Sequence, residues 1–501
     1  MVKVPPGTTG DPSLDRDHLD RSAFSGVAWS GAAKWSTQLI AWASTIIIAR
    51  ILTPSDYGLL SMATVFLGIV MMLSEFGVGT AVVTMRELPA EALQQLNTFS
   101  LFLGLGGTLV TTLAAYPLGL FFRAPNLPPV LVVVGLTFTI ASLQAVPAAT
   151  LRRELQFRTL ALIDMCRGVV VPAVTLVGAL LGLRYWALAL GSVVGALVTT
   201  VLTLYFRREA FRTPRLSALK GVLSFGRDLL VARVAWITYQ NGDFAVAGRR
   251  LGQAALGAYS MAWTLANTPI EKVTTLLGDV TPSLFSAVQH DRAALRRYFL
   301  NLSQVLCLAI FPASVGLALV SGDAVSVLLG PKWVGTEGPL ALIALYAGAR
   351  SVSSLYSHVF SATRETRFAM WTSVVLAVLL LSGFIVGSYW GAQGIAAAWL
   401  VIHPCMSVYV FRRIGRVLDL STRAYLQALR LGVDGAVTMS LTLLPFQWFV
   451  AASWPAPVRL LFSILLGAAV FGLTTWILHR DRMRDIIKWV RRTRQGVPAE
   501  A

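Results

Sequence analysis

The sequence predicts an all-α integral membrane protein with about 14 transmembrane helices. Two bulk properties support this class: 55% of the 501 residues are hydrophobic, and only 13% are charged. A third observation is that the apolar residues gather in stretches long enough for a bilayer-spanning helix, which needs about 20 of them. The composition excludes a soluble enzyme, because the core of a soluble domain uses far fewer apolar positions.

The expected spans follow one another with short turns between them. Those before a basic linker at 207–223 cover about 23–50, 57–84, 97–121, 129–151, 160–183 and 185–206. Those after it cover about 224–247, 254–283, 299–321, 338–362, 369–388, 393–411, 431–451 and 458–479. The longest external loop, at about 322–338, is too short to hold a catalytic domain, so we expect a protein that is not an enzyme.

Polar tails flank the spans at both ends of the chain. Residues 1–22 contain prolines and four aspartates, which favours a disordered cytoplasmic tail over a cleavable signal. Residues 480–501 form a basic cytoplasmic tail, and we expect an interfacial amphipathic helix within its cluster at 480–494.

Positive charge predicts the orientation in the membrane. The chain has 42 Lys and Arg against 24 Asp and Glu, a net charge of +18. If the N-terminus is inside, 30 of the cations lie in or beside inner segments, seven lie in outer loops and five lie within spans. Because Lys and Arg concentrate on the cytoplasmic side, both termini are predicted to be cytoplasmic. The net charge is therefore mainly an orientation signal and not a nucleic-acid footprint.

The two halves of the chain repeat one another at an offset of 199 residues. Six residues around the first external turn recur in order: Arg50, Leu52, Gly58, Ser61, Met62 and Ala63 return as Arg249, Leu251, Gly257, Ser260, Met261 and Ala262. At the same offset Lys34 falls on Arg233. The repeat predicts two six-helix lobes of equal orientation, 23–206 and 224–411, followed by two added helices within 412–479.

Cations inside the spans mark candidate substrate-binding residues. An ionised side chain in mid-helix costs about 2.5 to 3.5 kcal/mol on the insertion scale, so each needs water or a partner. Arg167 lies three residues from Asp164, and we expect that pair to form a local ion bridge. The remaining four cations are the candidate binding residues: Lys34, Arg233, Lys272 and Arg350. For Lys34 and Arg233 the alternative is that the side chain snorkels to the lipid headgroups.

Carboxylates within the spans are candidate proton carriers, because burial disfavours their charged form. Glu75 and Asp243 are the two that we single out. Glu75 could equally pair with Lys34 across the first hairpin. The three cysteines lack C-x-x-C spacing and the chain lacks a phosphate-binding loop of the ATPase type, so we expect no metal and no cofactor.

The residues around the first external turn resemble a known family. The run at 48–58, Ile-Ala-Arg-Ile-Leu-Thr-Pro-Ser-Asp-Tyr-Gly, followed by Met62 and Phe66, is similar to the first hairpin of bacterial polysaccharide flippases of the Wzx type. That superfamily also holds the MATE exporters and the lipid II flippase. The resemblance implies a MATE-like fold with a cationic cavity. It also implies that the chain flips undecaprenyl-pyrophosphate-linked oligosaccharide across the bacterial inner membrane by alternating access.

The implied pathway is lipopolysaccharide or exopolysaccharide biosynthesis, with a polymerase and glycosyltransferases as partners beside the lipid-linked substrate and the membrane lipids. The chemistry fits, because a pyrophosphate diester carries about two negative charges that fixed Arg and Lys groups hold well. Outward movement of each charge against a negative interior is favoured by about 2.3 kcal/mol per 100 mV. A MATE-like multidrug exporter, for which we expect an acidic cavity, and a lipid II flippase of peptidoglycan synthesis remain alternatives. A membrane scaffold or a polymer ligase is the non-transport alternative.

Overall fold

The computed structural model describes residues 42–75, 78–84, 89–214 and 216–484. These ranges form helices joined by short turns, with no strand among them, which confirms the predicted all-α class. Within the same ranges, eight segments are long and apolar enough to cross a membrane. The expected total of 14 helices stays a prediction.

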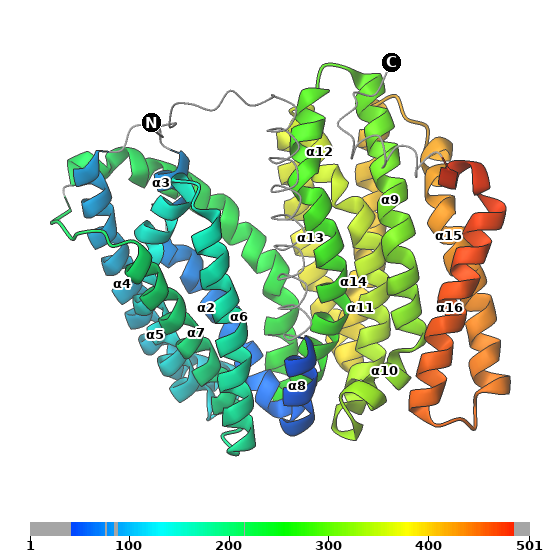
Figure 1. Ribbon diagram of the computed structural model, residues 1–501, viewed down its shortest axis with the longest axis horizontal. Helices are drawn as coiled ribbons and strands as arrows, with labels where there is room; N and C mark the ends of the chain where they lie inside the picture. Colours follow the sequence, from blue (N-terminus) through cyan, green and yellow to red (C-terminus); the bar gives the residue numbers. More distant parts are fainter. Residues whose placement is uncertain (1–41, 76–77, 85–88, 215, 485–501) are drawn as a thin grey trace, which may run out of the picture.

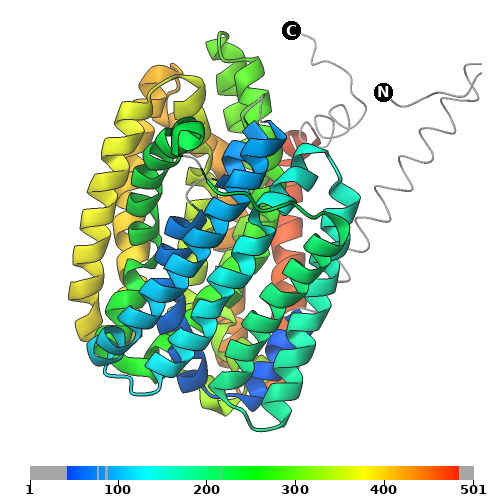
Figure 2. The ribbon, with the colours of Figure 1, turned by 90° about the vertical axis from the view of Figure 1, so that its left-hand side faces the viewer.

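The first half of the chain forms one group of helices (Figure 1). After the helix Trp42–Ile51 come α2 (Pro54–Glu75), α3 (Val78–Thr84), α4 (Ala90–Phe122), α5 (Leu127–Arg153), α6 (Phe157–Leu180) and α7 (Tyr185–Phe206). α2 and α3 cover the described part of the span expected at 57–84, and residues 76 and 77 between them lie outside the described residues. Figure 2 looks onto this group from its outer side, where its helices run side by side.

The linker after α7 lies against the first group. Its backbone is extended at Arg207, and the buried Asn97 of α4 donates from Nδ2 to the carbonyl oxygen of Glu209 at 2.9 Å. Ion pairs add to this, from Arg212 to Glu91 at 2.9 Å and from Arg207 to Glu154 at 3.3 Å. The described part of the linker is therefore fastened to the helices that precede it.

The long helix α8 (Leu216–Ala287) opens the second half. It breaks at Gly252, whose φ of 82° and ψ of −176° lie outside the helical region. Glycine adopts such a positive φ without the steric cost that a Cβ brings. The break lies between the two spans expected at 224–247 and 254–283.

The second group continues with α9 (Arg292–Leu319), α10 (Ser321–Leu328), η1 (Pro331–Thr336), α11 (Glu337–Ser353), α12 (Leu355–Ala362), α13 (Thr366–Gly387), η2 (Ser388–Trp390) and α14 (Gly391–Val417). One expectation needs correction here, because the segment at 322–338 is largely helical and α10 and η1 occupy most of it. α11 and α12 together cover the span expected at 338–362, and Ser354 between them keeps a helical φ of −59° and ψ of −27°.

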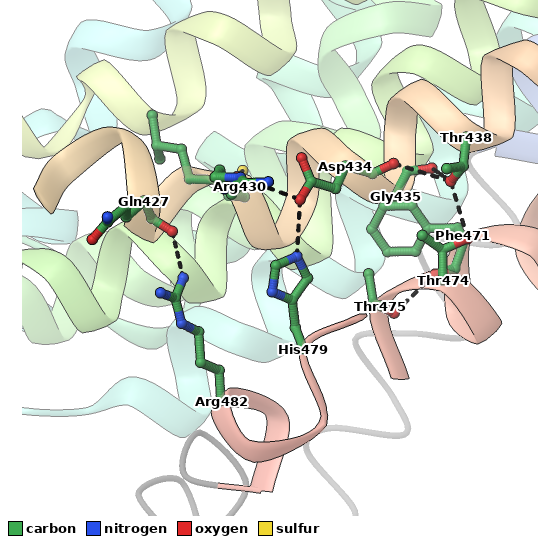
Figure 3. Close-up of polar contacts among 12 residues, drawn as sticks. Gln427, Arg430, Asp434, Gly435, Thr438, Phe471, Thr474, Thr475, His479 and Arg482 are labelled. Atoms are coloured by element: carbon green, nitrogen blue, oxygen red, sulfur yellow. Dashed lines mark hydrogen bonds and ion pairs between the residues drawn. The ribbon is translucent and has the colours of Figure 1, made fainter. Parts of the chain in front are cut away.

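Two further helices, α15 (Thr422–Pro445) and α16 (Ala456–Leu478), form a hairpin beside the second group, joined through η3 (Phe446–Val450). Figure 3 shows the polar contacts that fasten one end of it. Asp434 of α15 accepts from His479 Nε2 at 3.1 Å and lies 3.4 Å from Arg430 Nε. One turn further into the hairpin, the hydroxyls of Thr438 and Thr474 lie 3.0 Å apart. Outside the figure, Arg459 of α16 forms a two-contact ion pair with the buried Asp323 of α10, which fastens the hairpin to the second group.

The two groups meet along α2 and α8. In Figure 1 they come together near the label of α8 and diverge toward the end where α3 and α12 lie. One buried cluster joins them, with Leu59 and Met62 of α2, Tyr259 and Met261 of α8, and Trp333 of η1 among its members. Burial of apolar side chains from both halves is what holds the groups together at this end.

Candidate functional site

Arg350 is the predicted binding residue that the structure describes most fully. It lies in the last turn of α11 and is half-buried. Its guanidinium donates from Nη1 to Asn267 Oδ1 on α8, at 3.5 Å. Among the side chains that the structure describes, no carboxylate lies within ion-pair distance of Arg350. Its described neighbour is a neutral amide, so no carboxylate among the described side chains cancels its positive charge.

Asn267 is nearly fully buried, with 4% of its surface exposed. Its Nδ2 donates to the carbonyl oxygen of Trp263 at 3.1 Å, one turn earlier on α8. This bond orients the amide so that its oxygen faces the guanidinium. Asn267 is not among the site residues predicted from the sequence, although an asparagine within an apolar span is a signal that could have pointed to it.

Aromatic rings surround the helix turn that carries Arg350. Tyr346, one turn before Arg350, lies 4.8 Å from the Trp399 ring and 5.2 Å from the His403 ring, both on α14. Trp263 of α8 lies 5.5 Å from Trp399. Rings at these distances pack favourably, so α8, α11 and α14 are held together beside Arg350.

Asp243 lies in the first part of α8 and is completely buried. Its Oδ2 accepts from the Tyr259 hydroxyl at 2.6 Å and from Trp399 Nε1 at 3.0 Å, and its Oδ1 accepts from the backbone N–H of Phe244 at 2.9 Å. The carboxylate thus has a donor on each oxygen and ties both parts of α8 to α14. Trp399 connects it to the ring cluster beside Arg350.

The other predicted site residues are not tested by these contacts. Lys34 lies outside the described residues. Arg233 and Lys272 belong to α8 and Glu75 ends α2, but the structure describes no side chain at these positions. The structure therefore brings two of the six, Arg350 and Asp243, to one ring cluster, without a direct contact between them.

Polar side chains continue from Arg350 along two helices. On α12, Ser357 and Ser361 are exposed, and on α8 Thr264 is exposed. The Thr264 hydroxyl donates to the carbonyl of Ser260 at 2.9 Å, and that of Ser361 to the carbonyl of Ser357 at 2.9 Å. Their donors are satisfied within the helix while their oxygens still accept, which suits a surface for sugar hydroxyls.

The expected bridge between Asp164 and Arg167 is wrong. Both side chains are described, and no ion pair joins them within 4.0 Å. A spacing of three residues permits contact on a helix but does not require it, and solvent or headgroups satisfy exposed charges equally well.

The end where the groups meet is closed by contacts between repeat-related residues. A Cβ placed on Gly58 of α2 would overlap the carbonyl oxygen of Gln253, and one placed on Gly257 of α8 would overlap that of Pro54. Gly58 and Gly257 are counterparts in the repeat, so the crossing is reciprocal. Only glycine allows the two backbones to approach this closely.

Side chains of η1 and the first described helix tighten this crossing. The indole Nε1 of Trp333 donates to the carbonyl of Ala49 at 2.9 Å, and Arg50 Nε donates to the carbonyl of Leu328 at 2.9 Å. Lys332 Nζ lies 3.4 Å from the carbonyl oxygen of Arg50. The carbonyls that end one helix in each half are therefore capped by donors from the other half.

These features define a membrane transporter of two lobes: repeat-related helix groups, joined at one end, with a cation beside polar stripes. Solved structures show the same fold. The lipid II flippase MurJ in an inward closed conformation matches 91% of this chain and 100% of its own, with a TM-score of 0.68 at 13% identity. An inward-facing multidrug resistance transporter of the MATE family matches 77% and 96%, with a TM-score of 0.58 at 17% identity. The MATE-like fold is thus confirmed.

The chain belongs to the family described as polysaccharide biosynthesis protein, whose sequence model matches residues 47–337. It is similar to the lipopolysaccharide biosynthesis protein WzxC of Escherichia coli K12, with 26% identity over 82% of this chain and 85% of that protein. It is also similar to the succinoglycan biosynthesis transport protein ExoT of Rhizobium meliloti, with 24% identity over 95% and 97%. The chain is thus a multi-pass membrane protein of a polysaccharide biosynthesis family. The two relatives are named for biosynthesis or transport, and neither name is that of an enzyme.

Proposed function

We propose that the chain flips a lipid-linked oligosaccharide, carried on undecaprenyl pyrophosphate, from the inner to the outer leaflet of the bacterial inner membrane. The observation that carries this proposal is the half-buried Arg350, whose described partner is the neutral Asn267. A cation held in this way attracts an anionic group, and a guanidinium binds phosphate oxygens through paired hydrogen bonds. The prenyl tail stays in lipid while the charged head enters between the lobes.

The names of two relatives support this proposal. One is named as a succinoglycan transport protein and another as a teichuronic acid biosynthesis protein, TuaB of Bacillus subtilis, which is 24% identical over 90% of this chain and 95% of its own. Both names refer to the biosynthesis of a saccharide polymer. Lys34, Arg233 and Lys272 remain proposed binding residues that would add to the charge of Arg350.

Transport proceeds by alternating access in this proposal. The glycine crossing and the contacts of Arg50 and Trp333 close the outer end, and the lobes must separate there to release the headgroup. Both termini are cytoplasmic in this orientation. Glycosyltransferases that build the headgroup act before the flippase, and a polymerase takes the product outside.

The proposal is tested by polymer export in a strain that depends on this chain. We expect Arg350→Ala to abolish export while the protein is inserted at normal abundance. Arg423→Ala is the control, because Arg423 is an exposed cation near the start of α15, a helix that contributes no residue to the site described above. Normal export with Arg350→Ala would remove Arg350 from the site.

The two alternative transporters predict other results in the same system. A multidrug exporter would raise resistance to cationic drugs, and loss of Arg350 would leave that resistance intact because a cation does not attract a cation. A lipid II flippase would support growth when peptidoglycan flipping is depleted. Export of polymer without either effect supports the proposed function.

A further inference from the structure

We infer that Asn267 is a specificity-determining residue: its neutral amide orients Arg350 without cancelling the charge, and so keeps this part of the second lobe selective for an anionic pyrophosphate headgroup. The inference rests on the proposed function and assigns a role within the same site. It starts from the 3.5 Å contact between Arg350 Nη1 and Asn267 Oδ1.

The orientation of the amide follows from its two partners. Nδ2 donates to the carbonyl of Trp263 at 3.1 Å, and a carbonyl accepts only from a donor. A rotated amide would direct its NH₂ group at the guanidinium, which has donors alone. The oxygen therefore faces Arg350, and the amide occupies one of the five guanidinium N–H groups, while no other described side chain accepts from the rest, which suits them to phosphate oxygens.

An aspartate at this position would have nearly the same shape as asparagine and the opposite effect. Its carboxylate would lie where the amide oxygen lies, next to the guanidinium, in a place where only 4% of the Asn267 surface is exposed. A charge pair that is shielded from water is strong, so it would compete with the substrate for Arg350.

The residues that follow Arg350 on its own helix are also uncharged. The residues three and four positions later are Ser353 and Ser354, and the Ser353 hydroxyl donates to the carbonyl of Arg350 at 2.9 Å. Neither offers a countercharge. Tyr346, which lies one turn before Arg350 and against His403, is fully buried in the ring cluster and does not neutralise it.

The experiment measures binding of farnesyl pyrophosphate to the full-length protein in nanodiscs of phosphatidylcholine. The variants are Asn267→Asp, Asn267→Leu and Arg350→Ala. We expect Arg350→Ala and Asn267→Asp each to weaken binding by at least about tenfold, and Asn267→Leu, which loses the orienting contact but adds no charge, to weaken it by a smaller factor of about three. A merely structural role predicts the reverse order, because leucine loses both hydrogen bonds whereas aspartate keeps the acceptor.

The double variant Asn267→Asp with Arg350→Ala tests whether the carboxylate acts through Arg350. Binding no weaker than that of Arg350→Ala alone is expected, because residues that share one interaction are not additive. If Asn267→Asp fails to fold, Ser353→Asp supplies a carboxylate three residues after Arg350 on the same helix and is expected to weaken binding equally.

The outcomes separate this inference from the proposed function. Weak binding by Arg350→Ala together with normal binding by Asn267→Asp, or equal losses in Asn267→Leu and Asn267→Asp, would overturn the role of Asn267 and leave the flippase proposal standing. Normal binding by Arg350→Ala would overturn the site itself.

Discussion

At the scale of single residues, the structure distinguishes two kinds of intramembrane charge. The described partner of Arg350 is the neutral Asn267, whereas the buried Asp243 accepts from Tyr259, Trp399 and the backbone of Phe244. The first arrangement suits binding of a ligand, and the second stabilises the fold around the carboxylate. A buried acceptor of this kind is costly to remove, since its donors are then left unpaired.

Replacement of the carboxylate is expected to lower stability. Asp243→Asn places an NH₂ group among donors, so we expect a loss of about 1 to 3 kcal/mol in the free energy of unfolding. Thermal denaturation in detergent measures it. Asp419→Asn, at an exposed turn with a φ of 49°, is the control and is expected to change stability by less than about 0.5 kcal/mol. An unchanged melting temperature for Asp243→Asn would contradict the structural role.

Proton coupling makes a separate prediction for the two carboxylates. If Glu75 or Asp243 carries a proton, Glu75→Gln or Asp243→Asn abolishes proton movement that accompanies transport in liposomes, because an amide does not titrate. A pH-sensitive dye inside the vesicles reports it. Transport and proton movement that are unchanged in both variants would eliminate these residues as carriers.

At the scale of helices, the reciprocal crossing of α2 and α8 depends on glycine. Gly58→Ala brings a methyl group into the carbonyl of Gln253, and we expect it to cost about 1 to 3 kcal/mol and to impair polymer export. Gly68→Ala is the matched control on the same helix, because a Cβ at Gly68 meets nothing within 4 Å. Equal export by the two variants would show that the close approach is dispensable.

The ion pair between α10 and α16 predicts a second effect at this scale. Removal of Arg459 leaves Asp323, whose side chain is 9% exposed, without its partner. We expect Arg459→Ala to destabilise the protein by about 1 to 3 kcal/mol, a value reduced by the partial exposure of Arg459. The exchange of both residues, Asp323→Arg with Arg459→Asp, should recover part of the loss in melting temperature. No loss in the single variant would mean that the hairpin is held by apolar packing alone.

At the scale of the whole molecule, the orientation in the membrane is open to a direct test. In a background without Cys166, Cys307 and Cys405, we expect Val334→Cys to react with a membrane-impermeant thiol reagent added to intact cells. Arg423→Cys should react only after permeabilisation, because positive charge favours the cytoplasmic side. Labelling of both positions from outside would contradict the three spans that are expected between them.

Much of the architecture was predictable because hydrophobic periodicity and charge act locally along the chain. Apolar stretches between short turns are enough to predict helices, and the repeat of Gly58 as Gly257 is visible without coordinates. The helices α10 and η1 in an expected loop were not predictable from hydropathy. Hydropathy detects burial in lipid or protein, but not whether the connection between two spans is itself helical.

The sequence by itself determined the class of protein, the two-lobed repeat and the presence of Arg350 within a span, because each depends on composition or on spacing along the chain. Only the tertiary structure decided that Gly58 packs on Gly257 and that Asn267, 83 residues away in the chain, lies beside Arg350. The physical reason is that helix faces meet through shape and hydrogen bonding between distant segments, which no local pattern encodes. The chemistry proposed for the site follows from those contacts.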